Sequence, residues 1–419
     1  MRILAIAALL MLLVAAPTAA RTPAHAAAKA VSGQLIVGFE KNVSSDRQRS
    51  VLKKLGAKVH KRLANIRAAA VRPRSGLALS VLRKRLAKHP AVQYVERDYI
   101  LQRTIAPNDP LLSQQTALAV SGPGTVLAQT AWDKRTNCSK VAVLDTGMQY
   151  THPDLKDNVW HNKHEVDDNG KDDDKNGYVN DYYGLNAIAG KGNAEDKDGH
   201  GTHVSGIIGG RGNNALGVSG LCWEATVMPV KFMNSKGQGS TSDAVAGMEY
   251  AIQTGAKIIN NSWGGTAKSQ SLANEIERAE DKGVLIVVAA GNNSQDIDKD
   301  PFYPADYTNG NILCVAAITA TNALASFSDF GSKNVDLAAP GNDILSTYPT
   351  STYKVLSGTS MATPYVTAAA AMLRQQNNDL TYSKLRSLIK AHVTPNAALA
   401  GKSVTGGQLN VPGALSAAG

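Results

Sequence analysis

From residue 139 onward, the chain alternates short apolar runs with amphipathic stretches. The apolar runs are rich in β-branched and aliphatic residues and predict six buried strands: Lys140–Leu144, Thr226–Phe232, Lys257–Asn260, Val284–Ala290, Ile312–Ala317 and Val335–Ala338. The stretches between and after them have helical periodicity and predict helices over Gly201–Gly209, Asp243–Thr254, Ser271–Lys282, Thr359–Gln375 and Tyr382–Ala391. Continuously apolar strands separated by helices indicate an α/β fold, in which helices cover both faces of a parallel central sheet.

The segment before this region predicts a smaller α+β unit over residues 33–101. Its pattern predicts three strands and two helices, which in chain order are the strand Gln34–Phe39, the helix Asp46–Leu55, the strand Ala68–Arg72, the helix Leu77–Lys88 and the strand Val92–Val95. The stretch Gln102–Pro110 has no periodicity and contains two prolines, so we expect an exposed linker there.

The N-terminus carries an apolar run of 14 residues, Ile3–Ala16, preceded by Arg2 and followed by small-residue sites at 18–20 and 24–26. The run is too short for a membrane span and has the layout of a secretory signal peptide. We therefore expect residues 1–28 to be a signal peptide, and the protein to be secreted and extracellular, with no membrane anchor.

The composition, 43% hydrophobic and 19% charged, excludes collagen-like, coiled-coil and wholly disordered chains. The net charge of +10 is unevenly distributed: residues 31–107 hold 17 basic against four acidic side chains, whereas residues 108–419 hold 24 basic against 30 acidic ones. This distribution predicts two units that attract each other within the chain. Nucleic-acid binding by the basic segment is the alternative, but no recognition motif accompanies the charge, so we expect no nucleic-acid partner.

The chain has three cysteines, Cys138, Cys222 and Cys314. In an exported chain they predict one disulfide and one unpaired thiol. No CxxC pair exists, so a zinc site built from cysteines is not expected.

Four motifs carry residues of catalytic type: Val141–Gly147, Asp198–Gly206, Ala289–Asn292 and Ser357–Pro364. Several of them lie where predicted strands end, and parallel sheets bind their ligands at the carboxyl ends of strands. Amide hydrolysis needs a nucleophile, a base, a group that orients the base, and donors for the developing oxyanion. An Asp at a strand end, a His flanked by glycines and a Ser at a helix N-terminus supply these groups, in one of the chain orders in which this triad recurs.

With these four motifs in this order, the sequence resembles the subtilisin-like serine proteases (subtilases), and within them the thermitase-like branch. The resemblance covers residues 105–415. It implies a ferredoxin-like inhibitory propeptide over residues 29–104, followed by a subtilisin-like catalytic domain over residues 105–419. It also implies a secreted, calcium-dependent serine endopeptidase that is made as a zymogen and acts on proteins and peptides.

By motif match, the resemblance makes Asp145 the group that orients the base, His200 the general base and acid, and Ser360 the nucleophile. The side-chain amide of Asn292 and the backbone N–H of Ser360 would bind the oxyanion. Taken singly, Asp145, His200 and Ser360 also fit a strand-end turn, a loop histidine and a helix N-cap. His203 lies one helical turn after His200, and we expect it to be a structural, hydrogen-bonded histidine.

The resemblance also places a substrate cleft along two strand-end segments. Ser262, Trp263 and Gly264 form one edge, where an extended peptide pairs by strand addition. Ala290 and Gly291 are assigned to substrate binding as well. Trp263 stands where many relatives have a smaller aliphatic residue, which leaves the size of the pocket open.

Phe302 precedes Tyr303 and Pro304, near the base of the family's primary specificity pocket. If its ring points inward, it narrows that pocket. The alternative is that Phe302 packs in the core.

Two regions match the chemistry of calcium, which takes six to eight oxygen ligands. The first matches the family's strong site through the side chains of Asp109, Asp154 and Asn214 and the carbonyls of Arg211, Leu216 and Val218. The second is the acidic stretch 165–181. Within it, Asp172, Asp174 and Asn176 followed by Gly177 reproduce the opening of an EF-hand loop, but position twelve, counted from Asp172, is Tyr183 in place of Glu. The expected ligands of this stretch are Asp168, Asp172, Asp174, Asn176 and Asp181, and a solvated acidic loop is the alternative.

The resemblance further implies a cysteine pairing and a maturation route. Cys138 and Cys222 precede strands that are neighbours in the family's sheet, which makes them the expected disulfide and Cys314 a buried free thiol. The propeptide is expected to bind the catalytic domain in cis until self-cleavage within residues 103–108, at the Thr104–Ile105 bond.

Two other functions are weighed against the endopeptidase. A lipase or esterase of the α/β-hydrolase type is one, because Gly358–Ala362 nearly fits the nucleophile-elbow pattern and Asp379 and His392 follow it. That interpretation leaves Asp145 and His200 unexplained. The other is a catalytically inactive subtilase that serves as a calcium-stabilised binding module. A monomer is the default expectation.

Overall fold

The computed structural model describes residues 30–100 and 106–418. The signal peptide expected over residues 1–28 and the Thr104–Ile105 bond lie outside these residues. The chain divides between Gln102 and Arg103 into two compact units. Within the part of the chain that the structure describes, no helix combines the length and the apolar character needed to cross a membrane.

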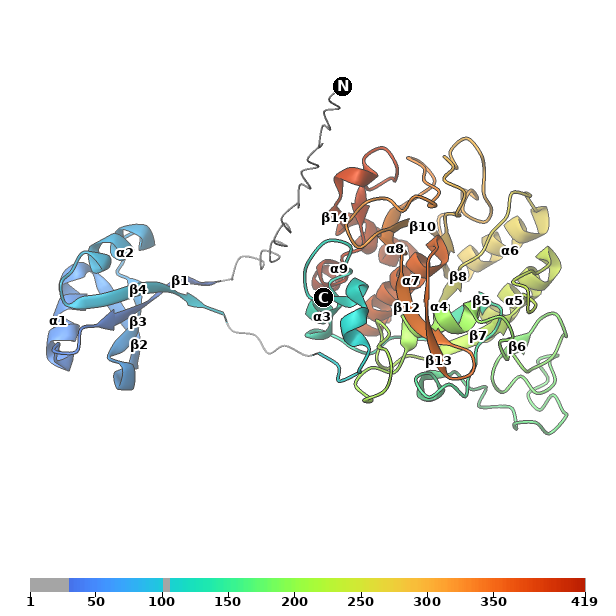
Figure 1. Ribbon diagram of the computed structural model, residues 1–419, viewed down its shortest axis with the longest axis horizontal. Helices are drawn as coiled ribbons and strands as arrows, with labels where there is room; N and C mark the ends of the chain where they lie inside the picture. The colour runs from blue at the N-terminus through green and yellow to red at the C-terminus, as the bar shows by residue number, and fades with distance from the viewer. Residues whose placement is uncertain (1–29, 101–105, 419) are drawn as a thin grey trace, which may run out of the picture. The chain divides into compact units, whose positions relative to one another are not determined.

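The N-terminal unit is a four-stranded antiparallel sheet packed against two helices (Figure 1). Its elements are β1 (Ala30–Phe39), α1 (Ser45–Leu55), β2 (Ala57–Leu63), β3 (Ala68–Pro73), α2 (Leu79–Ala87) and β4 (Val92–Tyr99). The strand order β2-β3-β1-β4 is that of a ferredoxin-like unit, as predicted. Leu35 and Val37 of β1 share a buried cluster with Leu82 and Leu86 of α2, so one face of the sheet is covered by helix.

Strand β2 is the element of this unit that the sequence pattern did not predict. It lies at an edge of the sheet, beside β3, and four of its seven residues are basic or His. A register shift between Val59 and Lys61 also breaks the alternation of the strand. An edge strand keeps its polar side chains in water, which removes the apolar period that would reveal it.

The C-terminal unit is built on a nine-stranded sheet in the order β14-β15-β11-β10-β9-β8-β5-β7-β6. Its strands are β5 (Val141–Asp145), β6 (Leu185–Asn186), β7 (Val227–Lys231), β8 (Ile258–Asn261), β9 (Leu285–Ala289), β10 (Ile312–Ile318), β11 (Leu337–Pro340), β14 (Thr394–Pro395) and β15 (Gly407–Gln408). Every pair is parallel except β14 with β15. The six predicted strands are confirmed as β5 and β7 to β11, with ends shifted by one or two residues.

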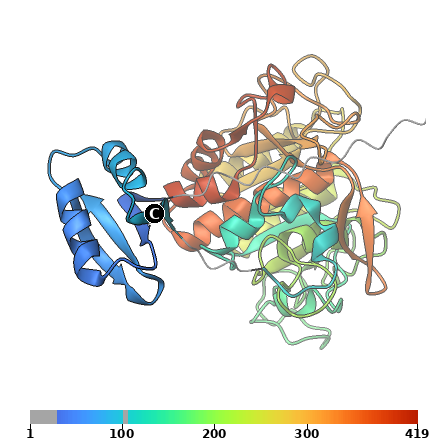
Figure 2. The same cartoon turned by 60° about the vertical axis from the view of Figure 1, so that its left-hand side comes forward.

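Helices cover both faces of this sheet, as predicted. One face carries α3 (Ala128–Trp132), α4 (His200–Gly209), α7 (Thr359–Gln376), α8 (Tyr382–Ala391) and α9 (Val411–Ala417). The other face carries α5 (Thr241–Gln253) and α6 (Gln270–Asp281), which lie apart from the first group in Figure 1. In Figure 2 the orange α7 and the red C-terminal helices lie together, in keeping with the buried cluster that they share. The sheet thus separates two cores, and α7 lies against its centre.

A two-stranded hairpin, β12 (Ile344–Tyr348) with β13 (Thr352–Leu356), lies outside the main sheet and was not predicted. It lies against α4, where the Ser346 hydroxyl donates a hydrogen bond to the His203 carbonyl at 2.7 Å. Side chains of β13 are mostly exposed. Because β12 is buried at four consecutive positions and β13 is mostly exposed, the hairpin lacks the alternating apolar pattern of a half-buried strand.

A disulfide joins Cys138 and Cys222, which confirms the expected pairing. The two cysteines precede β5 and β7, and these strands pair in parallel, so that their beginnings lie side by side. Cys314, in β10, is buried and unpaired, also as expected. Burial raises the pKa of its thiol well above the ordinary value, so the thiol stays protonated.

We expect the joint replacement of Cys138 and Cys222 by Ala to lower the free energy of unfolding by about 2–4 kcal/mol. The physical reason is that the disulfide links residues 84 positions apart and so restricts the unfolded chain. Urea unfolding in a Ser360→Ala background, which lacks the expected nucleophile, measures the effect. Cys314→Ala serves as the matched control, and equal midpoints for the double variant and its parent would contradict the prediction.

Candidate functional site

The carboxyl end of β5 meets the first turn of α4. Asp145 ends β5 and is fully buried, and His200 is the first residue of α4. The Asp145 Oδ1 atom lies 2.8 Å from His200 Nδ1 and also accepts the Thr146 N–H at 2.7 Å. The buried carboxylate holds the proton of the ring on Nδ1, which leaves Nε2 as the basic nitrogen.

This contact requires α4 to approach β5 very closely, and Gly201 makes the approach possible. The Gly201 N–H donates to Thr146 Oγ1 at 2.8 Å. A Cβ atom at position 201 would lie 3.1 Å from the Asp145 side chain and would clash with the carbonyl of Gly147. Glycine is therefore the residue that fits between the strand and the helix.

The pKa of His200 is set by two opposing effects. Burial lowers the pKa, whereas the charge and the hydrogen bond of Asp145 raise it, and the net result is a pKa above the ordinary value for His. The His200 side chain is still 26% exposed. Asp145 thus holds the ring through Nδ1, and the exposed part of the ring remains accessible to a ligand.

Ser360 is the second residue of α7, where the helix dipole favours negative charge. Its hydroxyl donates to the Ser262 carbonyl at 2.9 Å, and the Ser262 hydroxyl donates in return to the Ser360 carbonyl at 2.9 Å. The proton of the Ser360 hydroxyl is therefore directed to Ser262 and not to His200. Bonds between a catalytic hydroxyl and its base commonly form only when substrate is bound.

Asn292 follows β9, with its side chain exposed next to the start of α7. Its Oδ1 atom accepts hydrogen bonds from the Thr359 N–H at 2.8 Å and the Thr359 hydroxyl at 3.0 Å. Because these two bonds fix the oxygen, the amide N–H groups of Asn292 face away from Thr359 and are available as donors.

Ala290 and Gly291 also follow β9. Ala290 is fully buried in the core beside α5 and α6, so it presents no side chain to a ligand. The Gly291 N–H donates to the Thr359 hydroxyl at 3.2 Å, which ties this segment to the start of α7. Gly291 has φ +113°, a conformation that favours glycine.

A cavity of about 440 Å³ lies beside these residues. It is lined by Thr146, Asp198, His200, Phe232, Met233, Gly237, Gln238, Gly239, Ser262, Trp263 and Gly264. The Trp263 ring lies 4.8 Å from the Phe232 ring between centroids, so one wall of the cavity is aromatic. The cavity joins the His200 ring to the segment 262–264 that was expected to bind substrate.

His203 lies one turn further along α4 and is fully buried. Its Nε2 atom lies 3.0 Å from the carbonyls of both Ile344 and Lys354 in the β12–β13 hairpin. Burial lowers its pKa to about 4, so the ring is neutral at pH 7. These contacts agree with the structural role expected for His203.

The first expected calcium-ligand set is brought together in one place. The Asn214 Nδ2 atom donates to Asp154 Oδ1 at 2.8 Å. The Arg211 N–H donates to the Asp154 carbonyl at 2.7 Å, and the Leu216 N–H donates to Asn214 Oδ1 at 2.8 Å. Asp109 accepts the Asn214 N–H at 3.2 Å, and Asp154 accepts the Val218 N–H at 2.9 Å. Burial, with a contribution from the charge of Asp154, raises the pKa of Asp109.

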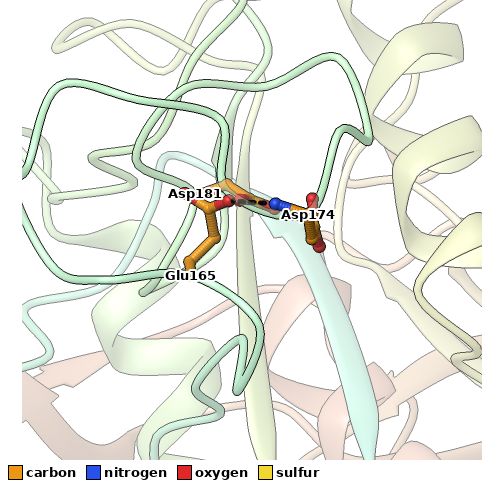
Figure 3. Close-up of side chains that lie close together, drawn as sticks. All are labelled: Glu165, Asp174 and Asp181. Carbon is orange, nitrogen blue, oxygen red and sulfur yellow. Dashed lines mark hydrogen bonds between the residues drawn. The ribbon is translucent and has the colours of Figure 1, made fainter.

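The second expected set forms around a different centre. The carboxylates of Glu165, Asp174 and Asp181 offer oxygen atoms that all lie within 4.8 Å of one another (Figure 3). Asn176 joins them, since its Nδ2 atom donates to Asp181 at 2.9 Å. Glu165 is 5% exposed, and its Oε2 atom is buried with no hydrogen-bond partner among the described residues.

Two of the residues expected there lie outside this cluster. The Asp172 carboxylate accepts the N–H groups of Asn176 and Gly177 and so closes a local turn. Asp168 lines a separate cavity with Tyr150 and Tyr183. Conversely, Glu165, at the start of the acidic stretch, is part of the cluster but is not among the ligands that the sequence predicts. Its sequence signal was its charge alone, because burial by the folded loop cannot be seen in the sequence.

Comparison with known proteins identifies the family to which this chain belongs. A family model described as the subtilase family matches residues 137–410, and one described as the fervidolysin N-terminal prodomain matches residues 16–98. The chain belongs to the subtilase family. It is a serine endopeptidase with an N-terminal prodomain, which agrees with the resemblance that the motifs indicated.

Two curated bacterial proteases and one solved protease structure are similar to this subtilase. A thermophilic serine proteinase from Bacillus sp. (strain AK1) is 33% identical over 351 residues, which is 83% of this chain and 79% of the relative. Thermitase from Thermoactinomyces vulgaris is 36% identical over 285 residues, 68% of this chain and 90% of the relative. A solved protease from Pseudoalteromonas arctica PAMC 21717 superposes with a TM-score of 0.63 at 29% identity, covering 75% of this chain and all of that one.

The opposed effects on the pKa of His200 give a direct prediction. We expect Asp145→Asn to lower the pKa of His200, because burial then acts without the charge of Asp145, the largest of the effects that raise this pKa. NMR titration of the imidazole in a Ser360→Ala background measures this, with the resonance assigned through His200→Gln. Asp157→Asn, at an exposed position, is the control, and an unchanged titration in Asp145→Asn would refute the coupling.

Proposed function

We propose that this subtilase is a secreted, calcium-dependent endopeptidase made as a self-processing zymogen, with Asp145, His200 and Ser360 as its triad. The observation that carries the proposal is the 2.8 Å contact between Asp145 and His200. His200 lines the same cavity as Ser262, and Ser262 is hydrogen-bonded to Ser360 at the N-terminus of α7. The alternative α/β-hydrolase mechanism uses Asp379 and His392, and the bond from His392 Nδ1 to the Leu388 carbonyl ties that ring to its own helix.

In this mechanism, His200 Nε2 takes the proton of the Ser360 hydroxyl as the oxygen attacks the peptide carbonyl. The hydroxyl first turns from the Ser262 carbonyl toward His200. Asp145 remains ionised and stabilises the imidazolium, which then gives its proton to the leaving amine. A water molecule repeats the sequence and releases the acyl group from Ser360.

The negative oxygen of the intermediate forms next to the start of α7. The Asn292 amide and the Ser360 N–H donate hydrogen bonds to it, and both donors are fixed before the reaction begins. Thr359 supports this arrangement, because its two hydrogen bonds to Asn292 Oδ1 orient the amide. The donors therefore need no reorganisation as charge develops.

The substrate backbone lies along residues 262–264, where it adds as a strand. The supporting observation is the cavity of about 440 Å³ between this segment and His200. An extended peptide satisfies backbone groups on that segment while its carbonyl reaches Ser360. Proteins and peptides are thus the substrate class.

The N-terminal unit acts as a propeptide in cis. Its excess of basic residues and the excess of acidic residues in the catalytic unit favour binding between them. Residues 29–104 form the propeptide and residues 105–419 the catalytic domain, separated by self-cleavage at the Thr104–Ile105 bond.

Intact mass spectrometry tests self-processing. We expect the wild type to lose the segment up to about residue 104 and Ser360→Ala to keep it after signal removal, because the variant lacks the nucleophile. A fluorophosphonate should label the wild type at Ser360 and leave the variant unlabelled. Full-length wild type without labelling would support the inactive binding module, and processing of the variant in a protease-free host would refute self-cleavage.

Calcium fits both ligand groups. Asp109, Asp154 and Asn214 with nearby carbonyls would hold one ion, and Glu165, Asp174, Asn176 and Asp181 would hold another. The fit of the second rests on the Glu165 carboxylate, which offers an oxygen within 4.8 Å of oxygens of Asp174 and Asp181. Its Oε2 atom is buried with no hydrogen-bond partner in the part of the chain that the structure describes. A bound ion supplies positive charge that offsets the repulsion between these groups. Burial, together with the charges of Asp181 and Asp174, raises the pKa of Glu165 in the ion's absence.

The calcium proposal predicts a metal-dependent stability. We expect chelation to lower the Tm of the Ser360→Ala protein, and Glu165→Gln to reduce the gain in Tm on adding calcium, because a ligand that binds only the folded state stabilises it. Calorimetric calcium titration should lose one binding event in Glu165→Gln. Glu277→Gln, exposed on α6, is the matched control. Equal calcium responses in all three proteins would contradict the second site.

A further inference from the structure

The reaction determines where the side chain of the substrate residue directly before the cleaved bond must lie. When a carbonyl carbon is bonded to Ser360 and its oxygen lies at Asn292, the side chain of that residue starts one bond away from the carbon. It must fit among the groups nearest to these two residues. Those groups are the segment 262–264, bonded to Ser360, and the segment 290–292, bonded to Thr359.

The two segments leave the sheet side by side. They continue β8 and β9, which pair in parallel up to Asn261 and Val288. Each segment contains a glycine, Gly264 in one and Gly291 in the other. Two glycine backbones facing each other normally leave room for a side chain between them, because neither contributes a Cβ atom.

In this chain, the ring of Phe302 lies against both glycines. A Cβ atom on Gly264 would be 2.2 Å from Cε1 of Phe302. One on Gly291 would be 2.1 Å from Oδ2 of Asp329 and 3.2 Å from Cδ1 of Phe302. The ring therefore lies close to both backbones, and the Asp329 carboxylate fills the space directly beside Gly291. The ring is half-buried and packs against the core of the α5 and α6 face.

Backbone hydrogen bonds hold Phe302 in this place. The next residue, Tyr303, exchanges two hydrogen bonds with Gly265, at 2.7 Å and 2.8 Å, which fastens the Phe302 segment to the strand end that contains Gly264. The Phe302 N–H itself donates to Asp306 Oδ2 at 2.5 Å. A backbone shift that moved the ring away from Gly264 and Gly291 would break these hydrogen bonds.

The open volume of the cleft lies elsewhere. Neither Phe302 nor Gly291 lines the cavity of about 440 Å³, which extends from His200 along Trp263 to Phe232. The cavity thus has room for side chains of other substrate residues along the segment 262–264. The space next to the reacting carbonyl, by contrast, is occupied by the Phe302 ring.

We propose that Phe302 is a specificity-determining residue that limits the position before the cut to small side chains: Gly, Ala, Ser and Thr. This inference rests on the proposed function, since it assumes attack by Ser360. The bond expected to be cleaved in the chain itself, Thr104–Ile105, has such a residue, a threonine, on its N-terminal side.

Two peptide p-nitroanilides that differ in one residue test the proposal, succinyl-Ala-Ala-Pro-Ala and succinyl-Ala-Ala-Pro-Phe. For the mature wild type, we expect kcat/KM to be at least about tenfold higher for the Ala peptide, a ratio within the range of steric discrimination by a pocket. In Phe302→Ala, kcat/KM for the Phe peptide should rise about tenfold or more, while that for the Ala peptide changes less than about threefold. Phe327→Ala, which removes a half-buried ring at the other core, should leave the ratio unchanged.

The outcomes distinguish failure of the specificity proposal from failure of the proposed function. A wild type that cleaves the Phe peptide as well as the Ala peptide would overturn the specificity proposal and leave the proposed function intact, and it needs no variant to fold. An unchanged ratio in a folded Phe302→Ala protein would do the same. Failure to cleave either peptide, together with no fluorophosphonate labelling of Ser360, would overturn the proposed function and the specificity proposal with it.

Discussion

The close approach of α4 to the end of β5 is the constraint on which the site depends. It places a carboxylate, Asp145, at a fully buried position, where a charge is tolerated only with strong hydrogen-bond partners. His200 and the Thr146 N–H supply partners to one carboxylate oxygen, and Gly201 allows the helix to come near enough. The sheet thus fixes the position of Asp145, and α4 fixes the position of the His200 ring. Because an unpaired carboxylate is costly at a buried position, the contact between the two side chains is favoured.

The β12–β13 hairpin supports the same helix from the other side. His203, in α4, is held between the carbonyls of Ile344 and Lys354, one in each strand of the hairpin. Tyr353, also in the hairpin, donates its hydroxyl to Asp154 at 2.9 Å. One small element therefore contacts both the helix that carries His200 and a residue proposed to bind calcium. Stability at the proposed metal site and the position of the imidazole share this support.

The fold and the meeting of Asp145 with His200 could be predicted because each of their signals is local. Asp145 and His200 lie at the ends of regular elements whose apolar pattern is strong, so a short motif places them. Glu165 could not be chosen in the same way. Its neighbours in space, Asp174 and Asp181, are more distant in sequence than Asp168, which lies elsewhere. Where a loop brings its own carboxylates together depends on its folded path, and neither charge nor spacing encodes that path.

The reciprocal hydrogen bonds between Ser262 and Ser360 have a consequence for the site before a substrate binds. The Ser262 carbonyl belongs to the edge along which a peptide is proposed to add as a strand, and it also accepts the hydroxyl of Ser360, the proposed nucleophile. In the proposed mechanism, a peptide N–H that binds this carbonyl draws on the same oxygen and weakens its bond with the hydroxyl. Binding of the peptide then favours rotation of the hydroxyl toward His200. Substrate binding and activation of the proposed nucleophile are coupled through one backbone oxygen.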